Sequence, residues 1–174
     1  MKRQWIGGLL AALSLAWATS ATAAEPTKIA VLDASMTFGS VEQPITEHEQ
    51  ARLERFSSEL RHALERSDNY ELVDHADLQA LTKQHVGGRR INSCDSCQAR
   101  IGRDLGADRV IMPVADKMSE LIMSLRVEIR NTETGEPVGV RSVRIAGNTD
   151  ESWRRGRIAI HRDMDWPAPE EADR

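Results

Sequence analysis

Two cysteines separated by two residues are the residues of this sequence best suited to chemistry. Cys94-Asp95-Ser96-Cys97 contains both cysteines of the chain, so within the chain they pair only with each other. In an oxidising compartment such a pair forms a disulfide by default. At a helix N-terminus the dipole also stabilises a thiolate, which would suit thiol exchange or redox sensing. Because Asp95 beside the thiols opposes thiolate formation, a structural disulfide is the preferred interpretation.

Metal binding is a third interpretation of the cysteine pair. It needs three or four ligands, and His85 is the nearest histidine in the sequence, so His75, His161 or a second subunit would have to complete the site. We therefore expect no metal and no cofactor. The sequence has no glycine-rich phosphate loop, nucleophile elbow or zinc-protease motif, and its histidines have no partner at a recognisable catalytic spacing. An enzyme is not favoured, although a hydrolase with a dispersed site remains open.

Residues 1–24 have the three parts of a secretory signal peptide, a basic start, an apolar stretch and a small-residue end. We expect cleavage after Ala23 or Ala24. The apolar stretch is shorter than the roughly 20 residues of a membrane span, and no later segment is apolar enough to cross a membrane. The mature chain is therefore predicted to be periplasmic, where a disulfide persists.

The whole chain of 174 residues is 40% hydrophobic, 29% charged and 4% aromatic. Lys2 and Arg3 are the only charged residues of the signal segment, so the rest has 21 basic against 27 acidic side chains, a net charge of −6. That charge argues against nucleic acid as a partner. The length predicts one domain, residues 25–165, followed by a flexible tail, Trp166–Arg174, with two prolines and four charges.

The first half of the mature chain predicts strand, helix and strand, followed by a second helix. An unbroken apolar run indicates a buried strand, and Thr46 with Glu49 forms a capping box that starts the long helix. A crossover of this length pairs its two strands in parallel. The expected elements are strand Lys28–Asp33, loop Ser35–Gly39, helix Glu47–Arg66, strand Tyr70–Val73 and helix His75–Gln84 capped by Asp74.

The second half predicts a helix, three strands and a last helix. Apolar residues alternate with polar ones from Leu121, which indicates a strand with one buried face. In the return strand Val138 and Val140 are out of phase with Val143 and Ile145, so a bulge is expected near Arg141–Ser142. The expected elements are helix Cys94–Leu105, strands Arg109–Ala115, Leu121–Arg130 and Val138–Ala146, and a helix capped by Thr149 or Asp150.

These elements predict the fold class α/β (α+β). We expect a single domain with a mixed sheet of about five strands, of which the C-terminal three are antiparallel, and with helices packed on the sheet.

Several short motifs resemble a family of exported bacterial proteins of unknown function, from about Lys28 to His161. The resemblance lies in the Cys94–Cys97 pair, in Leu105-Gly106-Ala107-Asp108 and in residues 147–153, GNTDESW. The order of elements also resembles, more distantly, the periplasmic α/β domains of curli-secretion and TolB N-terminal-type proteins. The resemblance implies an accessory role in the cell envelope and no catalysis.

The matching residues have physical interpretations. Gly147, Asn148, Thr149 and Asp150 suit the exit from a strand and the cap of a helix, and Trp153 can anchor that helix to the sheet. Lys117 and Ser119 are expected at an exposed turn, where they could contact a partner. The expected function is a non-enzymatic periplasmic accessory or binding module that engages another envelope protein. The alternative is a thiol-redox or metal-handling protein that uses Cys94 and Cys97.

Overall fold

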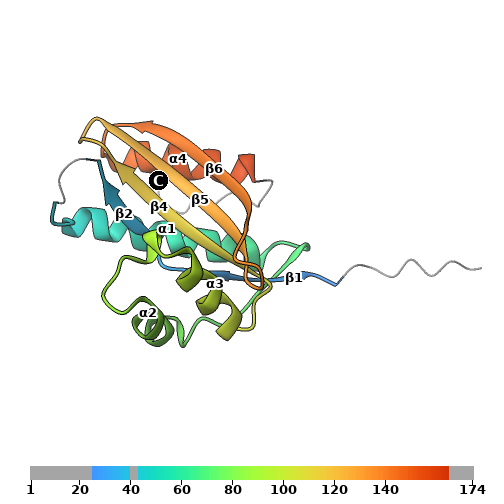
Figure 1. The fold of residues 1–174 in the computed structure, drawn as a ribbon. Helices are drawn as coiled ribbons and strands as arrows, with labels where there is room; N and C mark the ends of the chain where they lie inside the picture. The colour runs from blue at the N-terminus through green and yellow to red at the C-terminus, as the bar shows by residue number, and fades with distance from the viewer. Residues whose placement is uncertain (1–24, 40–42, 165–174) are drawn as a thin grey trace, which may run out of the picture.

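The computed structural model describes residues 25–39 and 43–164, and the predicted signal peptide and C-terminal tail lie outside them. The helices and strands follow one another as drawn in Figure 1. They are β1 (Thr27–Val31), β2 (Ser35–Phe38), α1 (Glu47–Glu65), β3 (Tyr70–Leu72), α2 (Leu78–Val86), a 3-10 turn (Ile91–Ser93), α3 (Asp95–Asp104), β4 (Arg109–Lys117), β5 (Ile122–Asn131), β6 (Pro137–Ala146) and α4 (Asp150–Asp163).

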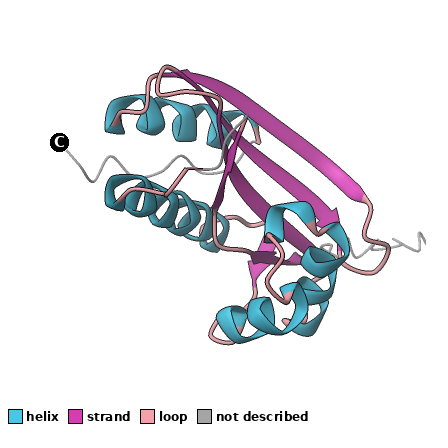
Figure 2. Ribbon diagram, turned by 60° about the vertical axis from the view of Figure 1, so that its left-hand side comes forward, coloured by secondary structure: helices cyan, strands magenta, loops and turns pink. Residues whose placement is uncertain are grey.

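The strands form one six-stranded mixed sheet in the order β3-β1-β4-β5-β6, with β2 also paired to β4. β1 is parallel to both β3 and β4, whereas β4, β5 and β6 form an antiparallel meander. The predicted fold class, with its C-terminal three antiparallel strands, is therefore confirmed. Helices α1 and α4 lie side by side on one face of the sheet, and α2 and α3 cover the other face at the β1 end (Figure 2).

The long helix α1 begins as its sequence predicts. Thr46 Oγ1 accepts a hydrogen bond from the Glu49 backbone N–H, and Glu49 Oε2 accepts one from the Thr46 N–H at 2.9 Å. The apolar residues that recur at helical spacing then face the sheet, where Phe56 and Leu60 are fully buried. This face forms one core cluster with the inner faces of β1, β4, β5 and α4.

Helix α4 approaches the sheet through a glycine. A Cβ at Gly156 would lie 2.6 Å from Ile145 Cγ2 and 2.9 Å from Leu125 Cδ1, so no larger residue fits there without a shift. Trp153, one turn earlier on the same face, is fully buried in the core cluster. The two residues together set how closely α4 packs on β5 and β6.

The segment expected to be the loop Ser35–Gly39 contains a strand instead. β2 is only four residues long and pairs in parallel with Val114–Lys117, the part of β4 that extends beyond β1. Its apolar residues, Met36 and Phe38, alternate with polar ones, but so short an alternation is not distinctive. The long strand β4 therefore carries two short neighbours along one edge, which local sequence does not reveal.

Three other expectations were wrong in detail. Helix α2 begins at Leu78, because the Asp74 carboxylate accepts from the Ala76 N–H and closes a turn before the helix. β5 begins at Ile122, so Leu121 lies in the preceding turn and is 76% exposed.

The bulge in β6 is at Val138. Ile129 pairs with Gly139 and Arg130 pairs with Pro137, whereas Arg141 and Ser142, where the bulge was expected, pair regularly. Val140 simply lies on the open face of the sheet.

Candidate functional site

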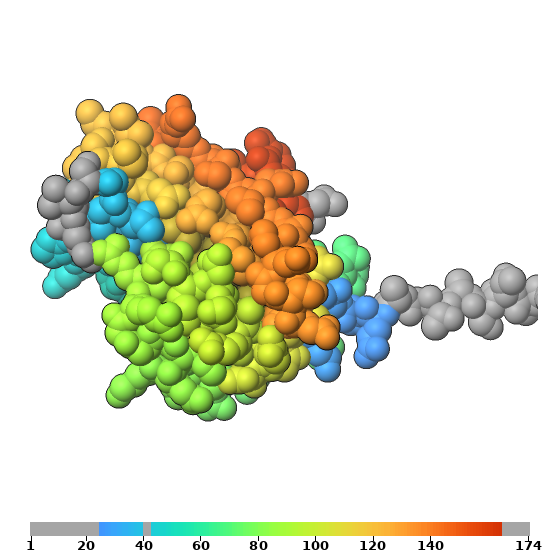
Figure 3. Space-filling view, viewed as in Figure 1, coloured from blue at the N-terminus to red at the C-terminus, as the bar shows by residue number. Residues whose placement is uncertain are grey.

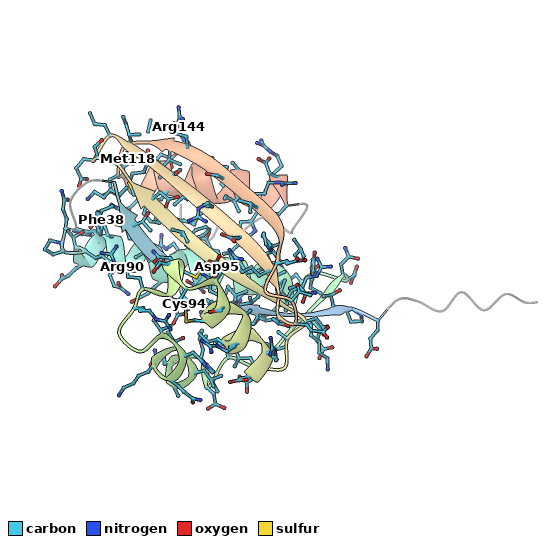
Figure 4. All side chains as sticks on the ribbon, viewed as in Figure 1. Phe38, Arg90, Cys94, Asp95, Met118 and Arg144 are labelled. Carbon is cyan, nitrogen blue, oxygen red and sulfur yellow. A yellow bond between two sulfur atoms is a disulfide. The ribbon has the colours of Figure 1, made fainter. Side chains whose placement is uncertain are left out.

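The residues that the sequence analysis singled out lie in two separate places. Lys117, Ser119, Asn148, Asp150 and Trp153 come together at one end of the meander, whereas the two cysteines lie at the start of α3. Figure 4 shows the separation through Met118, next to Lys117 in the chain, and Cys94. The first place contains the turn between β4 and β5 together with the first residue of β5, residues 118–122, which we call the hairpin tip. It also contains the N-termini of α1 and α4.

Lys117 is not exposed, contrary to the expectation, because two carboxylates cover its ammonium group. The residue is 6% exposed, and its Nζ donates to Glu49 Oε1 at 2.6 Å and to Glu120. Asn148 completes what we call the Lys117 cluster: its Nδ2 donates to Glu49 Oε1 at 2.7 Å and to Glu120 Oε2 at 3.0 Å. The cluster joins α1, the end of β4, the hairpin tip and the segment before α4.

The charges of the Lys117 cluster stabilise one another. Burial by itself would raise the pKa of Glu49, but hydrogen bonds from Lys117, Thr46 and Asn148 outweigh it and lower the pKa to about 2. Burial likewise opposes the charge of Lys117, yet its two carboxylate partners raise its pKa. The hydrogen bond from Lys117 lowers the pKa of Glu120. The cluster is therefore fully charged near neutral pH, with no group poised to exchange a proton.

Asn148 also connects the cluster to α4. Its Oδ1 accepts from Trp153 Nε1 at 2.9 Å and from Arg52 Nη1 at 2.9 Å, so all the polar atoms of its side chain are used. The N-cap of α4 is Thr149, whose side chain accepts from the Ser152 N–H. Arg52 on α1 further pairs with Asp150 at 2.6 Å, and this contact lowers the pKa of Asp150.

The hairpin tip lies next to the Lys117 cluster and exposes apolar side chains. Ser119 Oγ accepts from the N–H groups of Leu121 and Ile122 at 3.2 and 3.1 Å, and the Gly147 N–H donates to the Leu121 carbonyl at 3.0 Å. Met118, Leu121 and Ile122 are nevertheless 65%, 76% and 54% exposed. A hydrogen-bonded turn with exposed large apolar residues is suited to contact with another molecule.

Sequence reasoning missed Glu49 and Glu120 as partners of Lys117, and it placed Leu121 on the buried face of a strand. Glu49 was recognised only as half of a capping box. One of its carboxylate oxygens accepts the capping hydrogen bond from Thr46. The other accepts a hydrogen bond from Lys117, which lies 68 residues away in the sequence. No local signal reports so distant a contact. The lysine followed within three residues by a glutamate was the one hint available.

The cysteine pair forms a disulfide, Cys94–Cys97, with Cys94 as the N-cap of α3. Both residues are buried, at 5% and 0% exposure, in the second core cluster beneath α2 and α3. Cys97 Sγ lies 3.5 Å from Arg89 Nη2 and 3.9 Å from Arg100 Nη2. Within the described residues, no three His, Cys, Asp or Glu side chains are placed to hold a metal ion.

His85, the histidine considered as a metal ligand, contacts a carboxylate instead. Its Nε2 lies 2.7 Å from Asp104 Oδ2, which joins the end of α2 to the end of α3. The backbone carbonyl of the same residue contacts Cys97 Sγ at 3.3 Å. The disulfide region is therefore a packed helix pair, with its sulfur atoms turned away from solvent.

The described residues thus define a class: a single mixed α/β domain with helices on both faces of its sheet. In residues 25–39 and 43–164 no helix is long and apolar enough to cross a membrane. The chain belongs to the DUF3280 family, described as "Protein of unknown function (DUF2380)", which matches residues 27–164. The predicted membership of a family of unknown function is confirmed. Comparison with the curated proteins gives no match.

Solved structures share this fold at low sequence identity. Lipoprotein GNA1162 from Neisseria meningitidis is 14% identical, with a TM-score of 0.51 over 80% of this chain and 99% of that one. LpoB from E. coli is 17% identical, with a TM-score of 0.50 over 71% of this chain and 59% of LpoB. At these identities the likeness concerns the fold alone.

The expected topological likeness to TolB is also found. TolB from Acinetobacter baumannii is 12% identical, with a TM-score of 0.42 over 81% of this chain and 29% of TolB. That score is too low to support any functional argument. The likeness to curli-secretion proteins stays a prediction.

Proposed function

We propose that this protein is a non-enzymatic accessory module that binds another protein of the cell envelope, with the hairpin tip as part of the contact surface. The observation that carries the proposal is the exposure of Met118, Leu121 and Ile122 on a turn anchored by buried charges. Large apolar side chains exposed together on a rigid turn mark a protein contact more often than a catalytic site.

The surroundings of the tip support this proposal. Ile45, just before α1, is 42% exposed and belongs to the same end of the molecule. Ser119 and Glu120 are exposed beside these apolar residues and supply the polar rim that a contact surface needs. The fold shared with a neisserial lipoprotein is compatible with an envelope protein. In this proposal residues 1–24 direct export, and the mature chain functions in the periplasm.

The test is chemical cross-linking and copurification from periplasmic and membrane fractions. We expect a partner to be recovered with the wild-type chain and lost when Met118, Leu121 and Ile122 are all replaced by Ser. The matched control replaces Val138 and Val140 by Ser, because these residues are 48% and 45% exposed on a different surface of the sheet. Recovery of the same partner with both variants, or of none with the wild type, would overturn the proposal.

The second candidate is a thiol protein, and one observation favours it. Two guanidinium groups contact Cys97 Sγ, so they would stabilise a Cys97 thiolate after reduction. Burial of both sulfur atoms opposes attack by an external thiol. A reduction potential below about −300 mV, with no uptake of copper or zinc, would leave only a structural disulfide. A mixed disulfide trapped on a Cys97→Ala variant would instead favour this candidate.

A further inference from the structure

The hairpin tip contains a methionine that is far more exposed than the other methionines of residues 25–39 and 43–164. Met118 is 65% exposed, and Figure 3 shows the β4–β5 hairpin at the surface, at the upper left of the molecule. Met164 is partly buried and packs against the core cluster beneath α1 and α4. The other three are buried at 5% exposure or less: Met36, Met112 and Met123. Met118 is therefore the described methionine that a small solute reaches most readily.

The thioether of Met118 lies against the backbone just after β2. A Cβ built on Gly39 would lie 2.8 Å from Met118 Sδ and 2.9 Å from Met118 Cε, so a side chain at Gly39 would displace the thioether. The Gly39 N–H donates to the Lys117 carbonyl at 3.1 Å, which joins the two segments. The sulfur atom thus has a defined place on the hairpin tip, beside a residue that has no side chain to cover it.

Backbone hydrogen bonds define the shape of the tip without help from the Met118 side chain. The N–H groups of Met118 and Ser119 donate to the Ile122 carbonyl at 3.0 and 3.1 Å. The Asn148 N–H donates to the Glu120 carbonyl at 2.9 Å. Neither core cluster of the described residues includes Met118. A chemical change at its sulfur is therefore expected to alter the surface of the tip without unfolding the protein.

We propose that Met118 is an oxidation site and that its conversion to the sulfoxide weakens the protein contact at the hairpin tip, a role that rests on the function proposed above. The oxidant is hydrogen peroxide. A lone pair of Sδ attacks one peroxide oxygen, so the S–O bond forms as the O–O bond breaks. The leaving hydroxide takes the proton of the transferred oxygen and becomes water. The sulfur is oxidised by two electrons, and the peroxide is reduced by the same two electrons.

Oxidation makes one of the three large exposed side chains of the tip polar. Met118, Leu121 and Ile122 supply the apolar surface of the tip. A sulfoxide oxygen needs a hydrogen bond, so burying it in an apolar contact is unfavourable. We expect oxidation to weaken partner binding about tenfold. Because methionine sulfoxide is reduced enzymatically, the change is reversible.

The first test treats the folded mature chain with hydrogen peroxide and follows each methionine by peptide mass spectrometry. We expect Met118 to be oxidised about tenfold faster than Met164, because oxidation follows exposure. The urea midpoint of unfolding should not change after Met118 is oxidised. Oxidation of Met164 at the same rate, or a lower urea midpoint, would overturn the proposal.

The second test measures the apolar surface and needs no partner. Each protein is compared with its own untreated sample on a phenyl hydrophobic-interaction column. We expect the wild type to elute earlier after oxidation and Met118→Leu to show no shift. The matched control, Met164→Leu, should shift as the wild type does. An equal shift in Met118→Leu, or none in the wild type, would contradict the assignment to Met118.

The third test repeats the cross-linking and copurification with oxidised protein. We expect less partner to be recovered with oxidised wild type and oxidised Met164→Leu than with their untreated samples, and no such difference for Met118→Leu. Equal recovery with oxidised and untreated wild type overturns this proposal and leaves the proposed function intact. Recovery of no partner at all overturns the proposed function and with it the control of binding, whereas the first two tests still decide whether Met118 is the oxidation site.

Discussion

Two regions of this molecule are stabilised by different kinds of contact: the hairpin end, which contains the Lys117 cluster and the hairpin tip, and the disulfide end, which contains Cys94–Cys97 and the start of α3. The contacts differ in how far apart in the sequence the joined residues lie. In the Lys117 cluster, polar side chains join residues 68 and 99 positions apart in the sequence. The Cys94–Cys97 bond joins residues only 3 positions apart. The cluster therefore connects four parts of the fold, whereas the disulfide only fixes the start of one helix that hydrophobic packing already holds.

This difference shows which end depends on the tertiary structure. A covalent bond across so short a loop removes little freedom from the unfolded chain. A buried ion pair between distant elements forms only when the whole sheet and both helices are in place, and leaving one of its charges unpaired is costly. The exposed hairpin tip is thus supported by polar contacts between distant parts of the chain, from Glu49 to Lys117 and from Glu49 to Asn148.

The largest effect is expected for Lys117→Met. It leaves the Glu49 carboxylate buried at 1% exposure without its cation, and the free energy of unfolding should fall by about 3 to 5 kcal/mol. Urea unfolding measures the change. Lys83→Met, on the exposed surface of α2, is the control and should change stability by less than about 0.5 kcal/mol. Adding Glu49→Leu to Lys117→Met should recover part of the loss; a further loss would contradict this account.

The next effect is a decrease in the free energy of unfolding at low pH, which arises at the hairpin end. Because the folded-state pKa of Glu49 is about 2, against 4.5 normally, its contribution is present above about pH 4.5 and is lost as pH falls toward 2. The loss should reach up to about 3 kcal/mol. Urea unfolding of Glu49→Gln over this pH range should show a shallower decline. An equal decline in both proteins would mean that other carboxylates govern the acid sensitivity.

A smaller effect is expected at the disulfide end. Replacing both Cys94 and Cys97 by Ala should lower the free energy of unfolding by about 2 kcal/mol, the chain-entropy value for so short a loop. The variant should keep its far-UV circular dichroism spectrum and unfold in one step. A loss larger than that of Lys117→Met would reverse the comparison between the two ends.

The smallest effect is expected for Asp150→Asn, at the periphery of the hairpin end. The Asp150 side chain is 80% exposed, so its ion pair with Arg52 should contribute less than about 1 kcal/mol. The difference from wild type should shrink further in 1 M salt, because salt screens exposed charges. A salt-independent loss of several kcal/mol would show that the whole hairpin end, and not only the Lys117 cluster, is energetically coupled.

Much of the fold could be predicted because its signals are local. The capping box at Thr46 and the helical spacing of apolar residues located α1, and alternation from Met123 to Ile129 located the buried face of β5. β2 was missed because four residues carry too little pattern, and the strand that it pairs with, β4, lies about 80 positions away. The bulge was predicted at the wrong position, because a change in the phase of the apolar alternation does not distinguish a bulge from a regular strand with two exposed valines.

The candidate site could be predicted only as separate pieces. Lys117, Asn148 and Trp153 were singled out through their resemblance to a family, and the structure brings them into one network. Their partners Glu49 and Arg52 come from the opposite end of the sequence and had no such signal. The burial of Lys117 in particular reversed the expectation of an exposed contact residue.

The sequence by itself determined the type of most elements, their apolar faces and the pairing of the two cysteines, because capping, periodicity and a single possible partner are local or exclusive properties. Only the tertiary structure decided that Lys117 is buried, that β2 joins the sheet, and that the hairpin tip is exposed. These properties depend on contacts between residues far apart in the chain, and such contacts exist only once the sheet has assembled.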